Sequence, residues 1–233
     1  MKLYALLPFV LQVLAWPLAH AIFRISGSFS VRGYEHIKNI RGPVVFAANH
    51  VNDLDPVLTR AMRPWFSKPL FWVARFRKDY DTYADNPFRG WRGVLYTDWF
   101  FRSWGAYPAY KGTGDYEKSL RHHLKLLKDG YSVCIFPQGG KAKHLGKDAP
   151  VHGGAAFLAA AAQVPLVPVA ISGTLDLGPR ELFFGKRSLK VAFGKPLMVP
   201  KPQTKDDSDF YRNYTTKAVE AVYELLSSSS VKI

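Results

Sequence analysis

The chain contains little cysteine and few acidic residues. One cysteine, Cys134, occurs in 233 residues, so no disulfide can form within the chain. It lies in the apolar run 131–136, where nothing beside it would activate a thiol, so we expect a small buried hydrophobic residue. Asp and Glu total 18 against 32 Lys and Arg, which gives a net charge of +14. This excess favours an anionic partner: nucleic acid, an acidic membrane surface or a phosphorylated ligand.

Motifs that would define several other functions are also missing. The basic residues are scattered, and neither zinc-finger spacing nor an RNA-recognition signature occurs, which argues against nucleic acid as a partner. Without G-x-S-x-G there is no nucleophile elbow of a serine hydrolase, and without G-x-x-x-x-G-K-[ST] there is no Walker motif. The remaining histidines lack metal-ligand spacing, and we expect the adjacent pair His122 and His123 at the surface. The sequence contains no repeat of about 20–50 residues, which argues against a solenoid.

The apolar runs predict one α/β domain. A length of 233 residues with 48% hydrophobic content suits a single compact domain. Strands alternate with helices, which favours an α/β fold. We predict a membrane-anchoring segment over 1–27, a domain over 28–226 and a flexible tail over 227–233. The strands are expected at 28–31, 44–48, 70–74, 105–110, 131–136, 164–171 and 189–193, and the helices from Asp55, over 115–128, over 154–163 and along the stripe of Phe210, Tyr214, Val222 and Leu225.

The segment 3–25 is almost wholly apolar, and its polar side chains include Gln12 and His20. It is just long enough for a membrane-spanning helix, which needs about 20 apolar residues. Two prolines, Pro8 and Pro17, interrupt it and favour short helices lying in the membrane interface over a straight span. A secretory signal peptide and a buried helix of a soluble protein are the other interpretations.

The segment 76–102 mixes charges with many aromatic residues. We interpret it as an insertion or helical flap. Ordinary packing, membrane contact and acyl-chain binding remain open as its role.

The most informative segment is 49–55, which reads NHVNDLD. His50 directly follows a predicted buried strand, and Asp55 before Pro56 opens the next helix. Folds of this class place ligands at the carboxyl ends of their strands. A carboxylate on one imidazole nitrogen fixes the tautomer and leaves the other nitrogen free to accept a proton from a hydroxyl. The alternative is that Asp55 only caps the helix and His50 is an ordinary loop histidine.

A second cluster, 136–141, follows another predicted strand and reads FPQGGK. Glycines allow the backbone to approach a ligand closely, and their N–H groups can cradle phosphate. The lysines Lys141 and Lys143 add positive charge. A tight turn with solvated lysines is the alternative. Two further segments carry strands bounded by turn residues: one is 105–111, which ends in Lys111, and the other is 164–174. Neither segment indicates a function in isolation.

Taken together and in order, these segments resemble the glycerolipid acyltransferase family, of the lysophosphatidic acid acyltransferase type. His50 and Asp55 match its H-x4-D motif, and 105–111 is similar to its second block, which ends in a basic residue. The segment 136–141 resembles its F-P-E-G-T-R block, and 164–169 resembles its V-P-x-x-P-V block. The similarity covers roughly residues 30–200.

The resemblance implies a mixed, largely parallel central sheet wrapped by helices, with an N-terminal membrane-associated helical segment. It implies transfer of a fatty acyl group from acyl-CoA or acyl carrier protein to the hydroxyl of a lysophospholipid, with 1-acylglycerol-3-phosphate as the leading acceptor and phosphatidic acid as the product. It further implies membrane lipids as partners, and neither a metal nor a cofactor. The single cysteine fits a reducing environment, so we expect an active site that faces the cytoplasm.

The resemblance also assigns roles. His50 would be the general base and Asp55 would orient it. Lys111 and Lys141 would hold an acceptor phosphate, with Gln138, Gly139 and Gly140 completing the substrate-binding residues.

Three positions of the third block depart from the family pattern, because Gln138, Gly140 and Lys141 stand where glutamate, threonine and arginine are usual. Lysine lacks the bidentate fork with which arginine binds phosphate. An acyltransferase for a different lyso-lipid or an amino-lipid acceptor is therefore the first alternative, and a non-catalytic membrane-binding protein on the same scaffold is the second.

Overall fold

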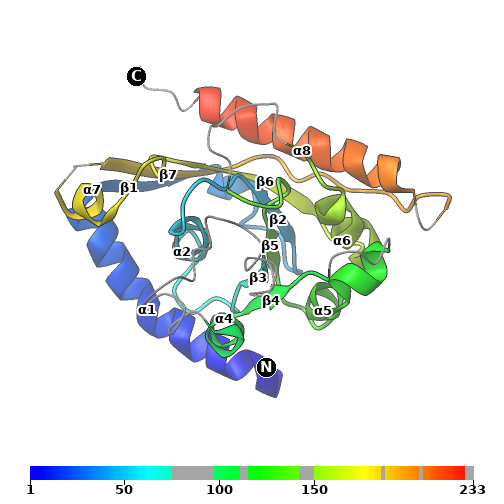
Figure 1. Cartoon of the computed structure of the whole chain (residues 1–233), viewed down its shortest axis with the longest axis horizontal. Coiled ribbons are helices and arrows are strands. Elements are labelled where there is room, and N and C mark those ends of the chain that lie inside the picture. The colour runs from blue at the N-terminus through cyan, green and yellow to red at the C-terminus, as the bar shows by residue number, and fades with distance from the viewer. Residues whose placement is uncertain (75–96, 111–114, 142–149, 185–186, 205–206, 229–233) are drawn as a thin grey trace.

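The computed structural model describes residues 1–74, 97–110, 115–141, 150–184, 187–204 and 207–228 (Figure 1). Most of the predicted aromatic insertion, residues 76–96, lies outside these ranges, and so does Lys111.

Within these ranges, seven strands form one sheet in the order β1-β7-β6-β2-β5-β3-β4. The strands β6 and β7 pair antiparallel, whereas the other neighbouring strands pair in parallel. The predicted mixed, largely parallel sheet is therefore confirmed. The strands are β1 (Gly27–Arg32), β2 (Val45–Ala48), β3 (Phe71–Ala74), β4 (Ala106–Pro108), β5 (Val133–Ile135), β6 (Leu166–Ser172) and β7 (Arg187–Phe193).

Helices cover both faces of the sheet (Figure 1). Because successive strand residues point to opposite faces, each central strand contributes to two apolar cores. Val45 and Ala47 face one core, while Phe46 and Ala48 face the other. The first core packs against α5 (Tyr116–Lys128), α6 (Gly154–Ala162) and α8 (Ser208–Ser228), and the second against α1 (Leu6–Ile25) and α2 (Asp55–Ala61). Shorter elements are η1 (Leu3–Ala5), η2 (Tyr34–His36), α4 (Asp98–Trp104) and α7 (Pro179–Phe184).

Two single residues in the cores test the sequence interpretation. Cys134 is fully buried on β5, as predicted. The prediction that His123 lies at the surface is wrong, because its side chain is 0% exposed. It lies three residues after Leu120 on the apolar stripe of α5, and its Nε2–H donates to the carbonyl oxygen of Tyr107 at 3.1 Å. Burial lowers the pKa of His123 to about 4, so the ring is neutral at physiological pH.

The N-terminal apolar segment forms η1 and then one continuous helix, α1, rather than short helices broken at the prolines. Pro17 lies inside α1, and Pro8 lies in its first turn, where an N–H has no intrahelical acceptor. The stretch Leu3–Ile25 is the one helix of sufficient length and apolar character to cross a membrane in the described part of the chain.

The inner face of α1 is attached to the domain by a buried polar side chain. Gln12 is 2% exposed, and all four of its hydrogen-bonding positions are used. Its Nε2 donates to the carbonyl oxygens of Leu70 (2.8 Å) and Trp104 (2.9 Å). Its Oε1 accepts from the Leu70 amide (2.9 Å) and from Arg60 Nε on α2 (3.0 Å). The glutamine that interrupts the apolar segment therefore anchors α1 to α2, to α4 and to the residue that precedes β3.

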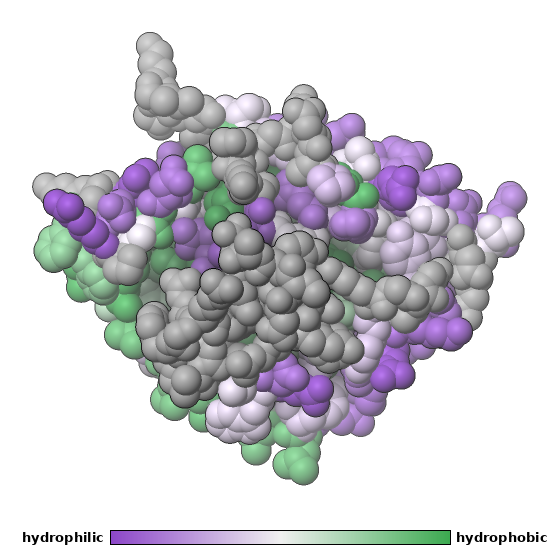
Figure 2. All heavy atoms as spheres, viewed as in Figure 1, coloured by the Kyte–Doolittle hydropathy of each residue, from purple (hydrophilic) through white to green (hydrophobic). Residues whose placement is uncertain are grey.

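The outer face of α1 is apolar and exposed. Figure 2 shows apolar side chains gathered at the edge of the molecule that α1 occupies in Figure 1. The aromatic residues Trp65 and Phe66 continue this surface, because Trp65 stacks on Trp16 of α1 and donates to the Val13 carbonyl. The exposed apolar residues of the helix are Leu6, Leu7, Val10, Leu14, Leu18 and Ile25.

We expect Gln12→Met to destabilise the domain by about 3 kcal/mol, because it removes the acceptor of the buried Arg60 Nε and the partners of backbone groups of Leu70 and Trp104. Urea unfolding in a mild detergent, followed by tryptophan fluorescence, measures this loss. The control is Leu14→Gln on the exposed face of the same helix, for which a change below about 0.5 kcal/mol is expected. Equal losses for the two variants would contradict the anchoring role of Gln12.

Candidate active site

The predicted catalytic residues lie where the central strand β2 ends. This strand is flanked by β5 and β6 and is fully buried, so its carboxyl end opens at the middle of the sheet edge. The residues 49–54 turn away from the strand, and α2 begins at Asp55. This is the position at which α/β sheets place their ligands.

His50 and Asp55 form a hydrogen-bonded pair. The Nδ1–H of His50 donates to Asp55 Oδ2 at 2.9 Å, and the same oxygen accepts the backbone amides of Val51 (2.7 Å) and Asn52 (2.8 Å). The Asp55 side chain is 0% exposed and that of His50 is 16% exposed. The interpretation of Asp55 as a simple helix cap is insufficient, because its carboxylate accepts hydrogen bonds from the amides of Val51 and Asn52 and from the imidazole ring.

The His50 ring is also held by stacking. It lies on the ring of Phe136 with 4.2 Å between centroids and 19° between the planes. Since Nδ1–H is directed at Asp55, the neutral ring keeps an unprotonated Nε2. This nitrogen hydrogen-bonds to none of the residues that the structure describes. The pair therefore presents one basic nitrogen in a fixed orientation.

Two asparagines that the sequence analysis did not single out hold the loop in place. The Asn49 side chain donates to the Ile171 carbonyl (2.9 Å) and accepts from the Ile171 amide (2.7 Å). These two bonds resemble the pair that a residue of a neighbouring strand would form with Ile171. Asn52 donates to the Leu177 carbonyl (3.0 Å) and accepts from the Leu54 amide (3.0 Å). Both asparagines flank His50 in the sequence, and asparagine side chains often hydrogen-bond to the backbone in loops. This position was the sequence signal that could have identified them.

The segment 136–141, with its two glycines, follows β5 and forms a tight turn, as one interpretation of the sequence predicted. The Gly139 amide donates to the Phe136 carbonyl at 3.0 Å, and its φ of +69° is one that side chains rarely adopt. A Cβ at Gly139 would lie 3.0 Å from the ring of His152, so a larger residue fits poorly. Gly140 continues the turn, and both glycines lie on the loop that carries Phe136 beside His50.

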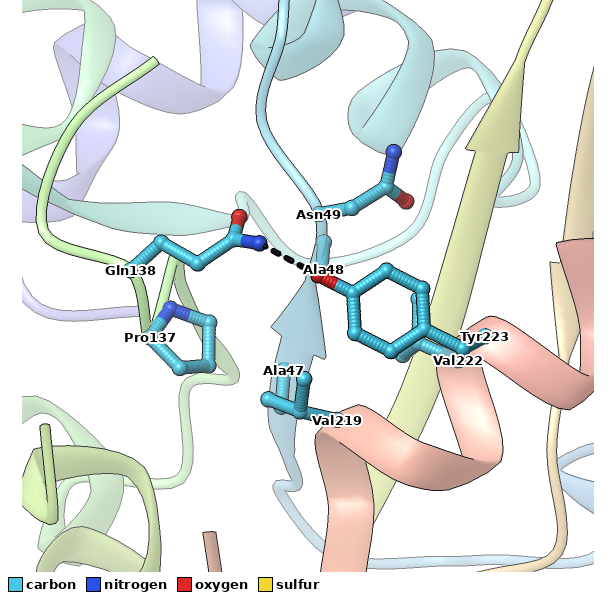
Figure 3. A pocket seen from close by; sticks show the side chains of 8 residues that line it. All are labelled: Ala47, Ala48, Asn49, Pro137, Gln138, Val219, Val222 and Tyr223. Atoms are coloured by element: carbon cyan, nitrogen blue, oxygen red, sulfur yellow. Dashed lines mark hydrogen bonds between the residues drawn. The ribbon is translucent and has the colours of Figure 1, made fainter. Parts of the chain in front are cut away.

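The Gln138 side chain contacts α8. Its Nε2 donates to the Tyr223 hydroxyl on α8 at 3.0 Å, and it lines a small pocket with Ala48, Pro137 and Tyr223 (Figure 3). Phe136, in contrast, packs against the core on the α2 side, where His50 meets Asp55. The structure thus brings Phe136 to the His50–Asp55 pair and Gln138 to α8.

Lys141 reaches the loop between β2 and α2. Its Nζ lies 2.9 Å from Asp53 Oδ1, with the two side chains 43% and 65% exposed. Of the two predicted phosphate-binding lysines, the structure describes this one. Among the described residues, no group of three or more His, Cys, Asp or Glu side chains could hold a metal ion.

A buried carboxylate that orients a histidine at the end of a central strand is an arrangement suited to general-base chemistry on an α/β fold. A model of the acyltransferase family matches residues 28–172, from β1 through β6. The chain therefore belongs to the acyltransferase family, and the resemblance inferred from its motif blocks is confirmed.

Two further proteins are similar to this chain. A protein of Bacillus subtilis named 1-acyl-sn-glycerol-3-phosphate acyltransferase is 38% identical over 79 residues, which cover 34% of this chain and 37% of that protein. The crystal structure of PlsC from Thermotoga maritima, a 1-acyl-sn-glycerophosphate acyltransferase, superposes with a TM-score of 0.55 at 20% identity, over 92% of this chain and 82% of that one. At this identity, the second similarity is one of fold.

Proposed function

We propose that this chain transfers a fatty acyl group from acyl-CoA or acyl carrier protein to the hydroxyl of a lysophospholipid, with 1-acylglycerol-3-phosphate as the acceptor and phosphatidic acid as the product. The observation that carries this proposal is the His50–Asp55 pair, at 2.9 Å on a fold of the acyltransferase family. The name of the Bacillus subtilis relative supports the choice of acceptor.

In the proposed reaction, His50 Nε2 removes the proton of the acceptor hydroxyl as its oxygen attacks the thioester carbonyl carbon. The resulting imidazolium is stabilised by the buried Asp55 carboxylate. Collapse of the tetrahedral intermediate breaks the carbon–sulfur bond, and the thiolate takes the proton from His50. The products are an ester and a free thiol. Backbone N–H groups near the glycine turn are the candidate donors to the oxyanion.

The acceptor phosphate is assigned to Lys111 and Lys141, with the turn at Gly139 and Gly140 shaping this side. The Gln138 amide, which donates to Tyr223, is assigned to holding this turn against α8. Lys141 supports the assignment through its contact with the loop that carries His50. These residues supply proton transfer and charge, so the proposed reaction proceeds without a metal or cofactor.

The proposal places α1 in the membrane interface rather than across the bilayer. A helix with one face hydrogen-bonded into the domain and an apolar outer face fits partial burial among lipids. Trp65 beside α1 has the amphipathic character of residues at the headgroup boundary. We infer that the site faces the cytoplasm, where both proposed acyl donors occur.

The acyl transfer is tested by incubating the purified chain in mixed micelles with acyl-CoA and a panel of lysophospholipids, and by measuring thiol release and the acylated product. We expect the fastest turnover with 1-acylglycerol-3-phosphate. In His50→Ala the rate should fall by at least ~100-fold, as is usual when a general base is removed.

Faster turnover of another lyso-lipid or an amino-lipid would replace the proposed acceptor. The absence of thiol release with every acceptor would favour the non-catalytic membrane-binding alternative. A His50→Ala protein that retains its rate would show that His50 is not the base. The control variant is His36→Ala, which changes a partly exposed histidine on η2, away from the catalytic loop.

The membrane assignment is tested with the double variant Leu14→Gln/Leu18→Gln, since these side chains are 68% and 63% exposed and contribute little to the fold. Deletion of the whole segment is a poorer test, because it removes the buried Gln12 and Phe23. We expect at least ~10-fold weaker co-sedimentation with phospholipid vesicles, because each leucine loses roughly 2 kcal/mol of apolar transfer free energy.

Met198→Gln serves as the matched control, because Met198 is 63% exposed and lies outside α1. Vesicle binding should be unchanged in this variant. If the leucine variant bound vesicles as tightly as the wild type, the anchor would lie elsewhere on the chain.

A further inference from the structure

A second charged pair lies beside the catalytic pair. Asp53 occupies the catalytic loop between His50 and Asp55, yet its side chain points outward, with 65% of its area exposed. Its Oδ1 lies 2.9 Å from Lys141 Nζ. The two residues are 88 positions apart in the sequence. The pair therefore links the loop that carries His50 with the loop that follows β5.

The backbone around Asp53 is well held. The Leu54 amide donates to the Asn52 side chain, and the Asp55 amide donates to the Asn52 carbonyl. On the other side of the pair, Lys141 ends the turn that begins at Phe136, whose ring stacks on His50. An anion bound by Lys141 would thus lie close to the Asp53 carboxylate as well as to the catalytic loop.

A carboxylate and a phosphate are alternative partners for one ammonium group. In the free protein the Lys141 ammonium is engaged by Asp53. Because the pair is exposed to solvent, it is weak enough to be opened by a substrate. The displaced carboxylate nevertheless stays near the phosphate, and like charges at short distance repel each other. Asp53 therefore opposes the binding of an anionic acceptor.

We propose that Asp53 is a specificity-determining residue that competes with the acceptor phosphate for Lys141 and so weakens the binding of acceptors with a dianionic phosphate. This inference rests on the proposed function, since it assigns Lys141 to the acceptor phosphate. An acceptor whose phosphate carries an adjacent ammonium group is penalised less, because the ammonium compensates the carboxylate. The residue thus reduces the margin by which the site prefers lysophosphatidic acid over zwitterionic lysophospholipids.

The test compares the full-length wild type with Asp53→Asn in mixed micelles, using lysophosphatidic acid and lysophosphatidylethanolamine as acceptors. For Asp53→Asn we expect the KM for lysophosphatidic acid to fall roughly three- to tenfold, with kcat within about twofold, because charge repulsion is removed from binding alone. The KM for lysophosphatidylethanolamine should change less than twofold. Lys141→Met should raise the KM for lysophosphatidic acid.

Asp209→Asn provides the matched control, since it removes the same charge from a side chain that is 94% exposed in the first turn of α8. It should leave both KM values unchanged. An unchanged or raised KM for lysophosphatidic acid in Asp53→Asn would overturn the proposal, as would equal gains for both acceptors. A fall in kcat with constant KM would show instead that the ion pair only supports the loop.

A binding measurement separates this proposal from the proposed function. Titration of glycerol 3-phosphate into the full chain in micelles, followed by calorimetry, reports the phosphate site without turnover. Tighter binding by Asp53→Asn than by the wild type supports competition at Lys141 even if no lysophospholipid in the panel is acylated. Equal affinities, or tighter binding by the wild type, refute it whatever the enzyme acylates.

Discussion

The loop between β2 and α2, which carries the proposed base, depends on one carboxylate oxygen. Asp55 Oδ2 accepts hydrogen bonds from the His50 ring and from the amides of Val51 and Asn52. A buried carboxylate is costly unless it is hydrogen-bonded, and here the donors come from the loop that it must hold in position. The same contacts that stabilise the charge therefore fold the loop and orient the imidazole. The Asp55 carboxylate therefore accounts both for the conformation of the loop and for the orientation of the proposed base.

The short helix α2 connects this site to the membrane-facing helix. Asp55 begins α2, and Arg60 near its end donates to Gln12 of α1. Seven helical residues span about 10 Å, so the two contacts lie a short, fixed distance apart. If α1 lies in the interface, as we propose, α2 sets the height of His50 above the lipid surface. A lipid acceptor could then reach the base with its acyl chain still in the bilayer.

The dyad was accessible from sequence because a buried strand, a short polar turn and an Asp-Pro helix start place its members together. The strands followed from their apolar runs, although the antiparallel pairing of β7 did not, since such runs do not encode direction. Single polar residues were harder to interpret. His123 lies on an apolar helix stripe, Gln12 satisfies four partners from three other segments, and Gln138 meets a tyrosine 85 positions away. Each depends on tertiary contacts that spacing cannot reveal.

The central claim is that the Asp55 carboxylate holds the proton of neutral His50 on Nδ1 and leaves Nε2 as the base. Nitrogen NMR of protein with ¹⁵N-labelled histidine reports this tautomer directly, with the His50 signals identified by their loss in His50→Gln. When the ring is neutral, we expect the Nδ1–H form to dominate in the wild type and to lose that dominance in Asp55→Ala. A wild-type ring protonated mainly on Nε2, or a tautomer that is unchanged in the variant, would contradict it.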